Sequence, residues 1–422
     1  MDSLPPDNNL TIPRPRAALA FILVTIMLDM LAMSLVIPVL PRLVLGFMHS
    51  DTASASRIIG IFGTAWAFMQ FVFSPIMGCL SDRFGRRPVI LMSNVGLGLD
   101  YILMALAPGI GLLFLGRIIS GITGASMSTA QAYIADVSPP EKRAANFGLM
   151  SVAFGLGFIL GPALGGLLGQ VNPRLPFWVA AGLSLCNACY GYFILPESLS
   201  SASRSKFSWQ NANPLGSLRF LRRNTGLLPL AGVHFLLWLS RAILPAIMVL
   251  YVTYKFHLSI STIGLLFAGV GFCSMLVGGV IVKPIVARLG ERLTVIIGLG
   301  CGAAGMGLFG NASSILLFCL GVPVMSLLGL AAPGLQGLMT QRIVPSDQGQ
   351  LQGALGSVTA ISQMIGPGLF SVLFARSLAA HAPPGTPFYV ASVLLAAAAA
   401  VAWSAARKGL RTTSIHPERT TR

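Results

Sequence analysis

Hydrophobic residues in this sequence gather into long apolar runs separated by short polar segments. Most runs have about 20 residues, the length that an α-helix needs to cross the hydrocarbon core of a bilayer. We predict one membrane-spanning helix in each of twelve runs: 17–40, 57–80, 88–107, 111–136, 144–168, 176–195, 226–251, 261–286, 293–310, 313–340, 351–375 and 386–405. The pattern therefore predicts an all-α polytopic membrane protein whose two termini lie on the same side of the membrane.

The positions of the basic residues give the orientation of these helices. Most of the 28 Lys and Arg residues fall in segments on the side of the N-terminus, from Arg14 and Arg16 to the tail beyond Arg407. Because positively charged loops stay in the cytoplasm, we predict that both termini are cytoplasmic. The same bias accounts for the net charge of +16, so no nucleic-acid partner is indicated.

Composition and motif content exclude several classes of function. Hydrophobic residues make up 55% of the chain and charged residues 9%, far from the values of ordinary soluble domains. All six cysteines fall within the apolar runs, so we predict neither a disulfide framework nor a redox or metal role for them. The sequence contains no Gly-x-x-x-x-Gly-Lys-Ser/Thr phosphate loop, so we predict that a gradient and not ATP hydrolysis is its energy source. We predict no cofactor and no metal.

The two halves of the sequence repeat one another. A shift of 205 residues places Gly161-Pro162 on Gly366-Pro367 and Gln131 on Gln336, as expected for the halves of a transporter. We therefore predict a cytoplasmic N-terminal tail (1–16), a six-helix bundle (17–196), a cytoplasmic linker with a surface helix (197–225), a second six-helix bundle (226–405) and a basic cytoplasmic tail (406–422).

Three motifs stand out within this frame. The first, which we name the charged turn, is Gly78-Cys-Leu-Ser-Asp-Arg-Phe-Gly-Arg-Arg-Pro88, between the second and third predicted spans. The second is Arg117-Ile-Ile-Ser-Gly-Ile-Thr-Gly-Ala125, in the fourth span, and the third is the glycine-rich segment from Gly157 to Gly166, in the fifth. A partial copy of the charged turn recurs at 287–292, with Ala287 at the position of Asp82.

Together these motifs resemble those of the major facilitator superfamily, specifically its twelve-helix drug:proton antiporters. Within that group the chain is most similar to tetracycline efflux transporters. The matching segments are Leu28-Asp29, Met69-Gln70, Ser81 to Pro88, Leu99-Asp100-Tyr101, Gly116-Arg117, Gly121 to Ala125, Leu335-Gln336-Gly337 and Leu351 to Ala354. The resemblance implies two pseudo-symmetric bundles and links Arg117 to proton coupling. Ser274 and Gly302 stand where those transporters carry a His and an Asp implicated in proton coupling, which puts that proton route in question.

Ionisable residues inside the spans are costly and therefore point to functional sites. Asp29 lies roughly 18 Å into the first span, near the bilayer midplane. We predict that it binds a proton in competition with substrate; the alternative is a carboxylate satisfied by a neighbouring helix. Asp100 and Arg117 share a depth of roughly 10 Å on adjacent spans, so an ion pair between them is allowed. Such a pair serves either transport or a structural tie between the two helices.

The seventh span contributes a second polar group. His234, Trp238 and Arg241 are spaced i, i+4, i+7 and share one helical face, which we expect to line the substrate cavity. Arg241 reaches nearly the depth of Asp29, and one hypothesis is a bridge between them; the other is an arginine bonded to nearby carbonyls. Further candidates for orienting a ligand, or equally for bonding across helices, are Gln70, Gln131 and Gln336.

The charged turn is expected at the cytoplasmic mouth, away from the substrate. Gly85 permits a tight turn, and Asp82 can accept from a helix N-terminus. The arginines can pair with carboxylates such as Asp136 or donate to helix C-terminal carbonyls. We predict that these contacts latch the outward-open state; the alternative is that the arginines only enforce topology. The predicted latch comprises Gly78, Asp82, Arg83, Gly85, Arg86, Arg87 and Asp136.

The glycine-rich segment has the spacing that lets helices approach closely, and its proline permits a kink. Its residues are Gly157, Gly161, Pro162, Gly165 and Gly166. Ordinary packing would explain them, whereas the resemblance implies the signature of exporters.

These observations predict a secondary active transporter of a bacterial inner membrane that works as a monomer. It would export a lipophilic, drug-like compound in exchange for protons, with a tetracycline-like substrate as one option. A metabolite or sugar exporter, or a facilitator, could share the architecture. A receptor or scaffold is disfavoured because no loop is long enough for a separate binding domain. An enzyme is disfavoured because the histidines outside the spans lack a catalytic constellation.

Overall fold

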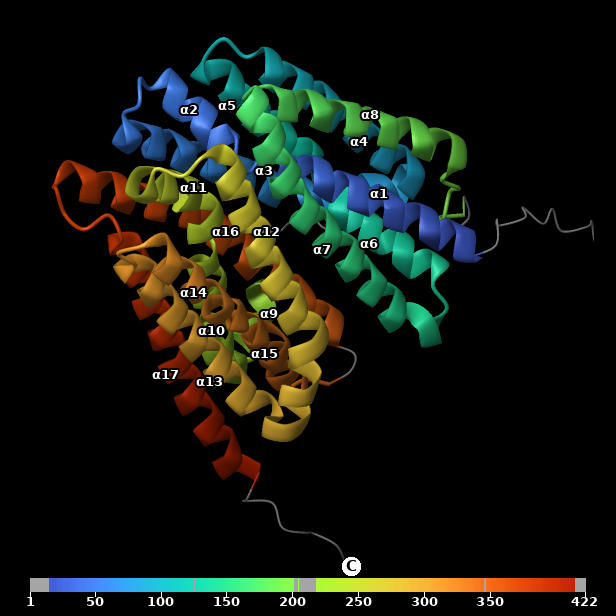
Figure 1. The fold of residues 1–422 in the computed structure, drawn as a ribbon. Helices are drawn as coiled ribbons and strands as arrows, with labels where there is room; N and C mark the ends of the chain where they lie inside the picture. The colour runs from blue at the N-terminus through green and yellow to red at the C-terminus, as the bar shows by residue number, and fades with distance from the viewer. Residues whose placement is uncertain (1–14, 125, 201–203, 205–217, 345–346, 414–422) are drawn as a thin grey trace, which may run out of the picture.

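The computed structural model describes residues 15–124, 126–200, 204, 218–344 and 347–413, and every regular element in this part of the chain is helical. Residues 1–14 of the predicted N-terminal tail and most of the predicted linker lie outside the described residues, as do residues 414–422 of the predicted C-terminal tail. Two bundles are evident in Figure 1, one blue to green and the other yellow to red.

The described part of the first bundle contains eight helices, because the first and the fourth spans each comprise two. They are α1 (Pro15–Leu35), α2 (Leu40–Phe47), α3 (Thr52–Phe84), α4 (Arg86–Leu106), α5 (Ile110–Thr123), α6 (Ser126–Val137), α7 (Pro140–Val171) and α8 (Leu175–Ile194). The short α9 (Leu218–Arg223) and the 3₁₀ turn η2 (Thr225–Leu227) precede the second bundle.

The second bundle begins at Leu228. Its elements are α10 (Leu228–Arg241), α11 (Ile243–Phe256), α12 (Ile260–Leu276), the π-helical η3 (Val277–Ile281), α13 (Val282–Asn311), α14 (Ile315–Ser326), the 3₁₀ turn η4 (Leu327–Leu330), α15 (Ala331–Thr340), α16 (Gln348–Ala379) and α17 (Thr386–Thr413).

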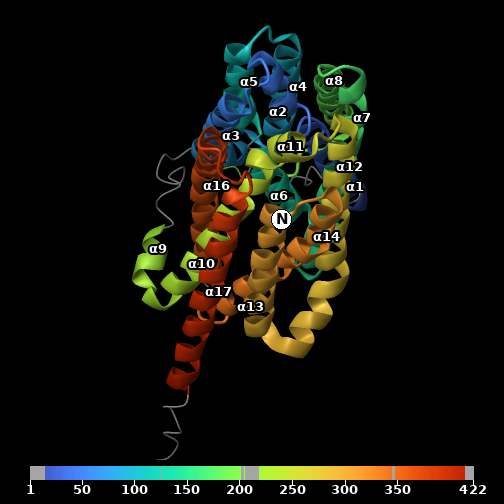
Figure 2. The same cartoon turned by 60° about the vertical axis from the view of Figure 1, so that its left-hand side comes forward.

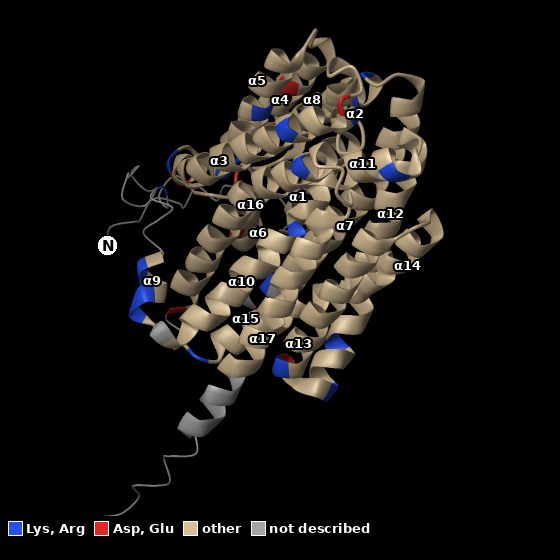
Figure 3. Ribbon diagram, turned by 90° about the vertical axis from the view of Figure 1, so that its left-hand side faces the viewer, with Lys and Arg blue, Asp and Glu red and all other residues tan. Residues whose placement is uncertain are grey.

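The described helices form eleven stretches that are long and apolar enough to span a bilayer. One of them, Ile260–Asn311, has 52 residues, or roughly 78 Å of helix, more than twice the thickness of the hydrocarbon core. Gly290 interrupts its helical conformation with a φ of 72°. The stretch therefore provides two spans, which gives the predicted total of twelve. Most residues of the described helices are uncharged, as the tan colour of the ribbon in Figure 3 shows.

The internal repeat is visible in the backbone. Gly85, in the charged turn, has a φ of 108°, and Gly290, its counterpart after the 205-residue shift, has a φ of 72°. They are the two glycines with positive φ in the described part of the chain. Non-glycine residues are strained in this conformation, so both halves use glycine for the same sharp connection between spans.

The two bundles meet along two seams, where α3 packs on α16 and α7 packs on α12. In Figure 2 each of these pairs lies side by side. In the first seam, Ser56 Oγ of α3 donates to the carbonyl oxygen of Ser371 in α16 (2.9 Å), near the non-cytoplasmic ends of both helices. Beside the seams, Arg42 Nη2 of α2 donates to the carbonyl oxygen of Leu258, which precedes α12 (3.2 Å). The bundles diverge toward the termini, so the structure is closed on the outside and open toward the cytoplasm (Figure 1).

Candidate functional site

A cavity of about 970 Å³ lies between the two bundles. Its wall is mainly apolar and includes Trp66 from α3 and Trp238 from α10. The polar side chains in the wall include those of Thr25, Asp29, Gln70, Ser74, Arg117, Ser120, Ser357, Thr359 and Gln363. This combination of apolar surface with a few polar groups is typical of small-molecule sites.

Asp29 lines this cavity from α1 and is also held by neighbouring helices. Asn187 Nδ2, from α8, donates to Asp29 Oδ1 at 2.8 Å and to the Thr25 carbonyl at 3.1 Å. With its amide nitrogen turned toward the carboxylate, Asn94 of α4 donates to both Asp29 oxygens at 3.0 and 3.2 Å. Both asparagines are fully buried. The Asp29 carboxylate is thus satisfied by neighbouring helices, as the structural alternative expects. It also lines the cavity, as proton binding requires.

The ion pair allowed between Asp100 and Arg117 is not formed. Asp100 is fully buried, and neither of its oxygens has a hydrogen-bond partner among the described residues. Arg117 lines the cavity, and its Nη2 instead contacts Met104 Sδ at 3.5 Å. The two residues come from adjacent helices, as predicted, but their charged groups are not in direct contact. A buried carboxylate without a partner is costly, which makes Asp100 a candidate for a group that changes partner or protonation during transport.

On α10, Trp238 contacts both His234 and Arg241. The rings of His234 and Trp238 lie 6.1 Å apart, and the Arg241 guanidinium lies 5.2 Å from the Trp238 ring. Only Trp238 of the three lines the cavity, and its indole nitrogen has no hydrogen-bond partner in the described part of the chain. His234 pairs instead with Thr359, at 2.8 Å.

The proposed bridge between Asp29 and Arg241 is absent from this arrangement. Arg241 stacks on Trp238, and α10 ends at Arg241. The carboxylate of Asp29 is already engaged by Asn187. The prediction of a bridge is therefore wrong for the state seen here, because each charge finds a partner within its own bundle.

The three glutamines have different surroundings. Gln70 lines the cavity from α3. Gln131 and Gln336 are exposed and do not contribute to the cavity wall. Gln131 and Gln336 correspond in the internal repeat, but neither reaches the cavity. The prediction that they orient a ligand is therefore wrong for this state.

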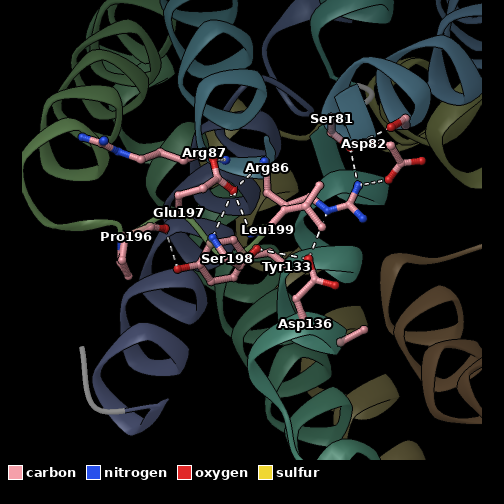
Figure 4. A network of polar contacts seen from close by, with 12 residues as sticks. Ser81, Asp82, Arg86, Arg87, Tyr133, Asp136, Pro196, Glu197, Ser198 and Leu199 are labelled. Atoms are coloured by element: carbon pink, nitrogen blue, oxygen red, sulfur yellow. Dashed lines mark hydrogen bonds and ion pairs between the residues drawn. The ribbon is translucent and has the colours of Figure 1, made fainter. Parts of the chain in front are cut away.

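The charged turn forms a polar network at the cytoplasmic ends of the first bundle (Figure 4). Arg86 forms an ion pair with Asp82, and its Nε donates to Asp136 Oδ2 at 3.1 Å. Its Nη1 also donates to Ser81 Oγ at 2.6 Å. Arg87 donates to the carbonyl of Tyr192, which lies in the last turn of α8, and stacks on the ring of Tyr192 at 5.6 Å. The predicted pairing of the arginines with Asp136 and with a helix C-terminus is thus seen in the contacts.

Two predicted members of the network have other contacts. Arg83 is exposed, and its guanidinium lies 5.1 Å from the ring of Phe84. Asp82 accepts from Arg86 rather than from a helix N-terminus. The helix N-terminus, that of α4, is capped by Glu197. The carboxylate oxygens of Glu197 accept from the backbone N–H groups of Arg86 (2.8 Å) and Arg87 (3.3 Å) at the start of α4.

All these contacts of the charged turn lie within the first bundle, while the two bundles are apart on the cytoplasmic side. The pairing of Arg86 with Asp82 and Asp136 therefore exists in an inward-open structure and does not require the outward-open state. The role of these residues as a latch stays a prediction.

The glycine-rich segment lies on α7 and packs on two partners. Ser34 Oγ, from α1, donates to the carbonyl of Gly157 at 2.9 Å, and Gly161 and Gly165 also face α1. Gly166 faces the other bundle: a Cβ on it would lie 3.0 Å from the Cα of Gly264 in α12. Pro162 lies within α7, which continues through it. The segment thus brings both α1 and α12 close to α7, as ordinary packing requires.

Sequence reasoning missed three residues of this site. Asn94 and Asn187 surround Asp29, and a signal for them was available, since each is a lone amide within an apolar run. Glu197 gave no such signal, because it follows Pro196 at the start of a polar segment. Only the folded chain shows that it caps a helix that begins more than a hundred residues earlier.

Comparison with known families and proteins gives a consistent result. The family model of the Major Facilitator Superfamily matches residues 22–238 and 230–420. The chain is 38% identical over 363 residues to the class C tetracycline resistance protein of Escherichia coli, covering 85% of this chain and 90% of that protein. It is 33% identical over 359 residues to the class B protein of the same organism, covering 84% and 88%.

Solved structures with similar folds are also transporters. The human organic anion transporter MFSD10 (TETRAN) superposes with a TM-score of 0.70 at 24% identity, covering 92% of this chain and all of that one. A bacterial homologue of the human lysosomal transporter Spinster, inward-facing and unoccupied, superposes with a TM-score of 0.73 at 16% identity, covering 95% and 98%. At these identities the likeness establishes the fold.

Proposed function

Because the chain belongs to the major facilitator superfamily and is a multi-pass transporter of the inner membrane, we propose that it exports a lipophilic, drug-like compound in exchange for protons. Tetracycline-like compounds are included among its candidate substrates, since the tetracycline resistance proteins are 31–38% identical to it. A monomer suffices for this function, because the cavity lies within one chain.

The observation that carries the proposal is the position of the cavity. It lies between the bundles, is closed by the seams α3–α16 and α7–α12, and opens toward the cytoplasm. A compound that enters from the cytoplasm would be released outside once the seams part and the cytoplasmic ends meet. The bundles at 17–196 and 226–405 are the units that would rock in this cycle, as in other transporters with internal repeats.

We place the proton-coupling groups in the first bundle. Asp29 and Arg117 face the cavity, and Asp100 is buried beside Gly116. The positions in the second bundle that correspond to the coupling residues implied by the resemblance hold no ionisable group: Ser274 is exposed, and Gly302 packs against Leu328. Protonation of Asp29 would weaken its attraction for a cationic group of the substrate and so allow protons and substrate to compete.

Asp29→Asn provides the main test. Everted vesicles from a pump-deficient host would be energised, and uptake of tetracycline and of a panel of lipophilic drugs would be followed. We expect uptake by the wild type to collapse on addition of a protonophore and to be lost in Asp29→Asn. The asparagine can still bond to its amide neighbours, so the variant should fold.

Asp51→Asn is a suitable control, because Asp51 is an exposed carboxylate at the start of α3, outside the cavity. It should transport normally. Uptake that resists both the protonophore and Asp29→Asn would refute proton exchange and favour a facilitator. The absence of uptake of any drug in the panel would favour a metabolite or sugar exporter.

A further inference from the structure

A second cavity lies along the α3–α16 seam, and none of its lining residues lines the first cavity. Its volume is about 370 Å³, and one wall comes from each bundle. On α3 it follows one helical face, with Arg57, Ile61, Thr64 and Phe68 at intervals of three or four residues. On α16 it is lined by positions 364, 368 and 372, which are likewise four apart. The cavity is therefore a groove that runs along the seam.

The groove has the length of one leaflet of the bilayer. α3 has 33 residues, or roughly 50 Å of helix, so each end extends about 10 Å beyond a hydrocarbon core of about 30 Å. Arg57 is the sixth residue of α3, about 8 Å from its non-cytoplasmic end, at the level of the lipid headgroups. Phe68 lies about 17 Å deeper, close to the middle of the bilayer.

Arg57 gives the headgroup end of the groove a positive charge. Its side chain is exposed and has no hydrogen bond or ion pair with any described residue. The nearby carboxylate of Asp51 forms no ion pair with Arg57; its Oδ1 accepts from the backbone N–H groups of Ala53 and Ser54 as the cap of α3. Hydrogen bonds from Ser54, and more weakly the charge of Arg57, hold the pKa of Asp51 below its usual value, so Asp51 remains charged at neutral pH.

The remainder of the groove is mainly apolar, and glycine in place of a larger side chain leaves room in its wall. Ile61, Phe68 and Val372 are exposed apolar residues around it. Gly368 leaves the floor open opposite Thr64, whose Oγ1 would lie only 3.1 Å from a Cβ at Gly368. A cation above an apolar channel one leaflet deep complements an anionic headgroup above an acyl chain.

We propose that this groove binds an anionic phospholipid of the outer leaflet, with its headgroup at Arg57 and one acyl chain along the seam. The lipid contacts α3 of one bundle and α16 of the other, so it stabilises the arrangement in which the seam is closed. The proposal does not depend on the compound that is transported.

Native mass spectrometry of the full-length protein would test the site. The protein would be purified in detergent and titrated with phosphatidylglycerol or phosphatidylcholine of the same chain length, and the association constant of the tightest adduct measured. We expect the wild type to bind phosphatidylglycerol more tightly than phosphatidylcholine. In Arg57→Gln the ratio of the two association constants should fall about fivefold, as expected for the loss of one basic residue at a membrane surface.

Arg376→Gln is the matched control, because Arg376 is an exposed arginine in the last turn of α16 that does not line the groove. It should keep the wild-type preference. Ala65→Phe, which fills the groove, should weaken both lipids alike. The proposal would be overturned if Arg57→Gln kept the preference for phosphatidylglycerol, or if Arg57→Gln and Arg376→Gln lost it equally. Displacement of the lipid by glycerol 3-phosphate alone would also overturn it.

Discussion

Glu197 connects the charged turn to the end of the first bundle. Its carboxylate accepts from two N–H groups at the start of α4 and from the backbone N–H groups of Ser198 and Leu199. These N–H groups would otherwise be unpaired, and the positive end of the helix dipole adds to the attraction for a carboxylate. Glu197 therefore fixes where α8 leaves the membrane relative to where α4 enters it.

We expect Glu197→Ala to lower the free energy of unfolding by about 1 kcal/mol, the usual cost of losing a helix cap. Thermal denaturation of the purified protein, followed by the exposure of its cysteines to a thiol-reactive dye, would measure the loss. Glu197→Gln retains an oxygen that can accept and should lose less. An alanine variant as stable as the wild type would show that this cap contributes nothing.

The seam between α7 and α12 depends on glycine at the level of the helices. Gly166 faces Gly264 across the seam, and a Cβ on Gly166 would lie 2.7 Å from the carbonyl oxygen of Ile260 and 3.0 Å from the Gly264 Cα. Two helices can approach this closely only where side chains are missing. Any larger residue at these positions forces the helices apart and so disfavours the closed outer end.

We expect Gly166→Ala to reduce the rate of export at least tenfold by destabilising the inward-open state. Initial rates in everted vesicles would measure the effect. Gly155→Ala is the matched control on the same helix, because a Cβ there would meet nothing within 4 Å. It should transport normally and gain helix stability. Equal rates in the two variants would contradict a role for the close approach.

For the whole molecule, the closed seams mean that transport requires separation of residues that now touch. The α3–α16 seam gives a test of this motion, because a Cβ on Gly60 would lie 2.6 Å from the Cβ of Ser371. A disulfide needs about 3.8 Å between these atoms, so a small relaxation of the seam would allow one to form.

With the six native cysteines replaced, we expect Gly60→Cys/Ser371→Cys to cross-link under oxidation and to lose more than about nine-tenths of its export activity. A reducing agent should restore export. Each single variant, treated with the same oxidant, serves as the control. Full activity in the cross-linked protein would show that the seam need not open.

Sequence reasoning succeeded where the physical rule is local. Apolar length set the twelve spans, because a bilayer tolerates only helices of a minimum length. The spacing of Arg86 from Asp82 pointed to contacts that the structure contains, and the rarity of acids in spans singled out Asp29, which lines the cavity; the roles of both stay predictions. The hydrophobic pattern did not predict where helices within a span break: α1 ends before Pro38, and the seventh span divides at Ala242.

The tertiary structure decided which charges meet. Asp100 and Arg117 have the depths required for an ion pair but miss each other, and Asp29 bonds to asparagines of α4 and α8 rather than to Arg241. Depth along a helix follows from the sequence, whereas the rotation of a helix about its axis depends on packing against its neighbours. The sequence by itself thus determined the spans, their orientation and the family; the fold alone placed the cavity, its open side and the partners of each buried charge.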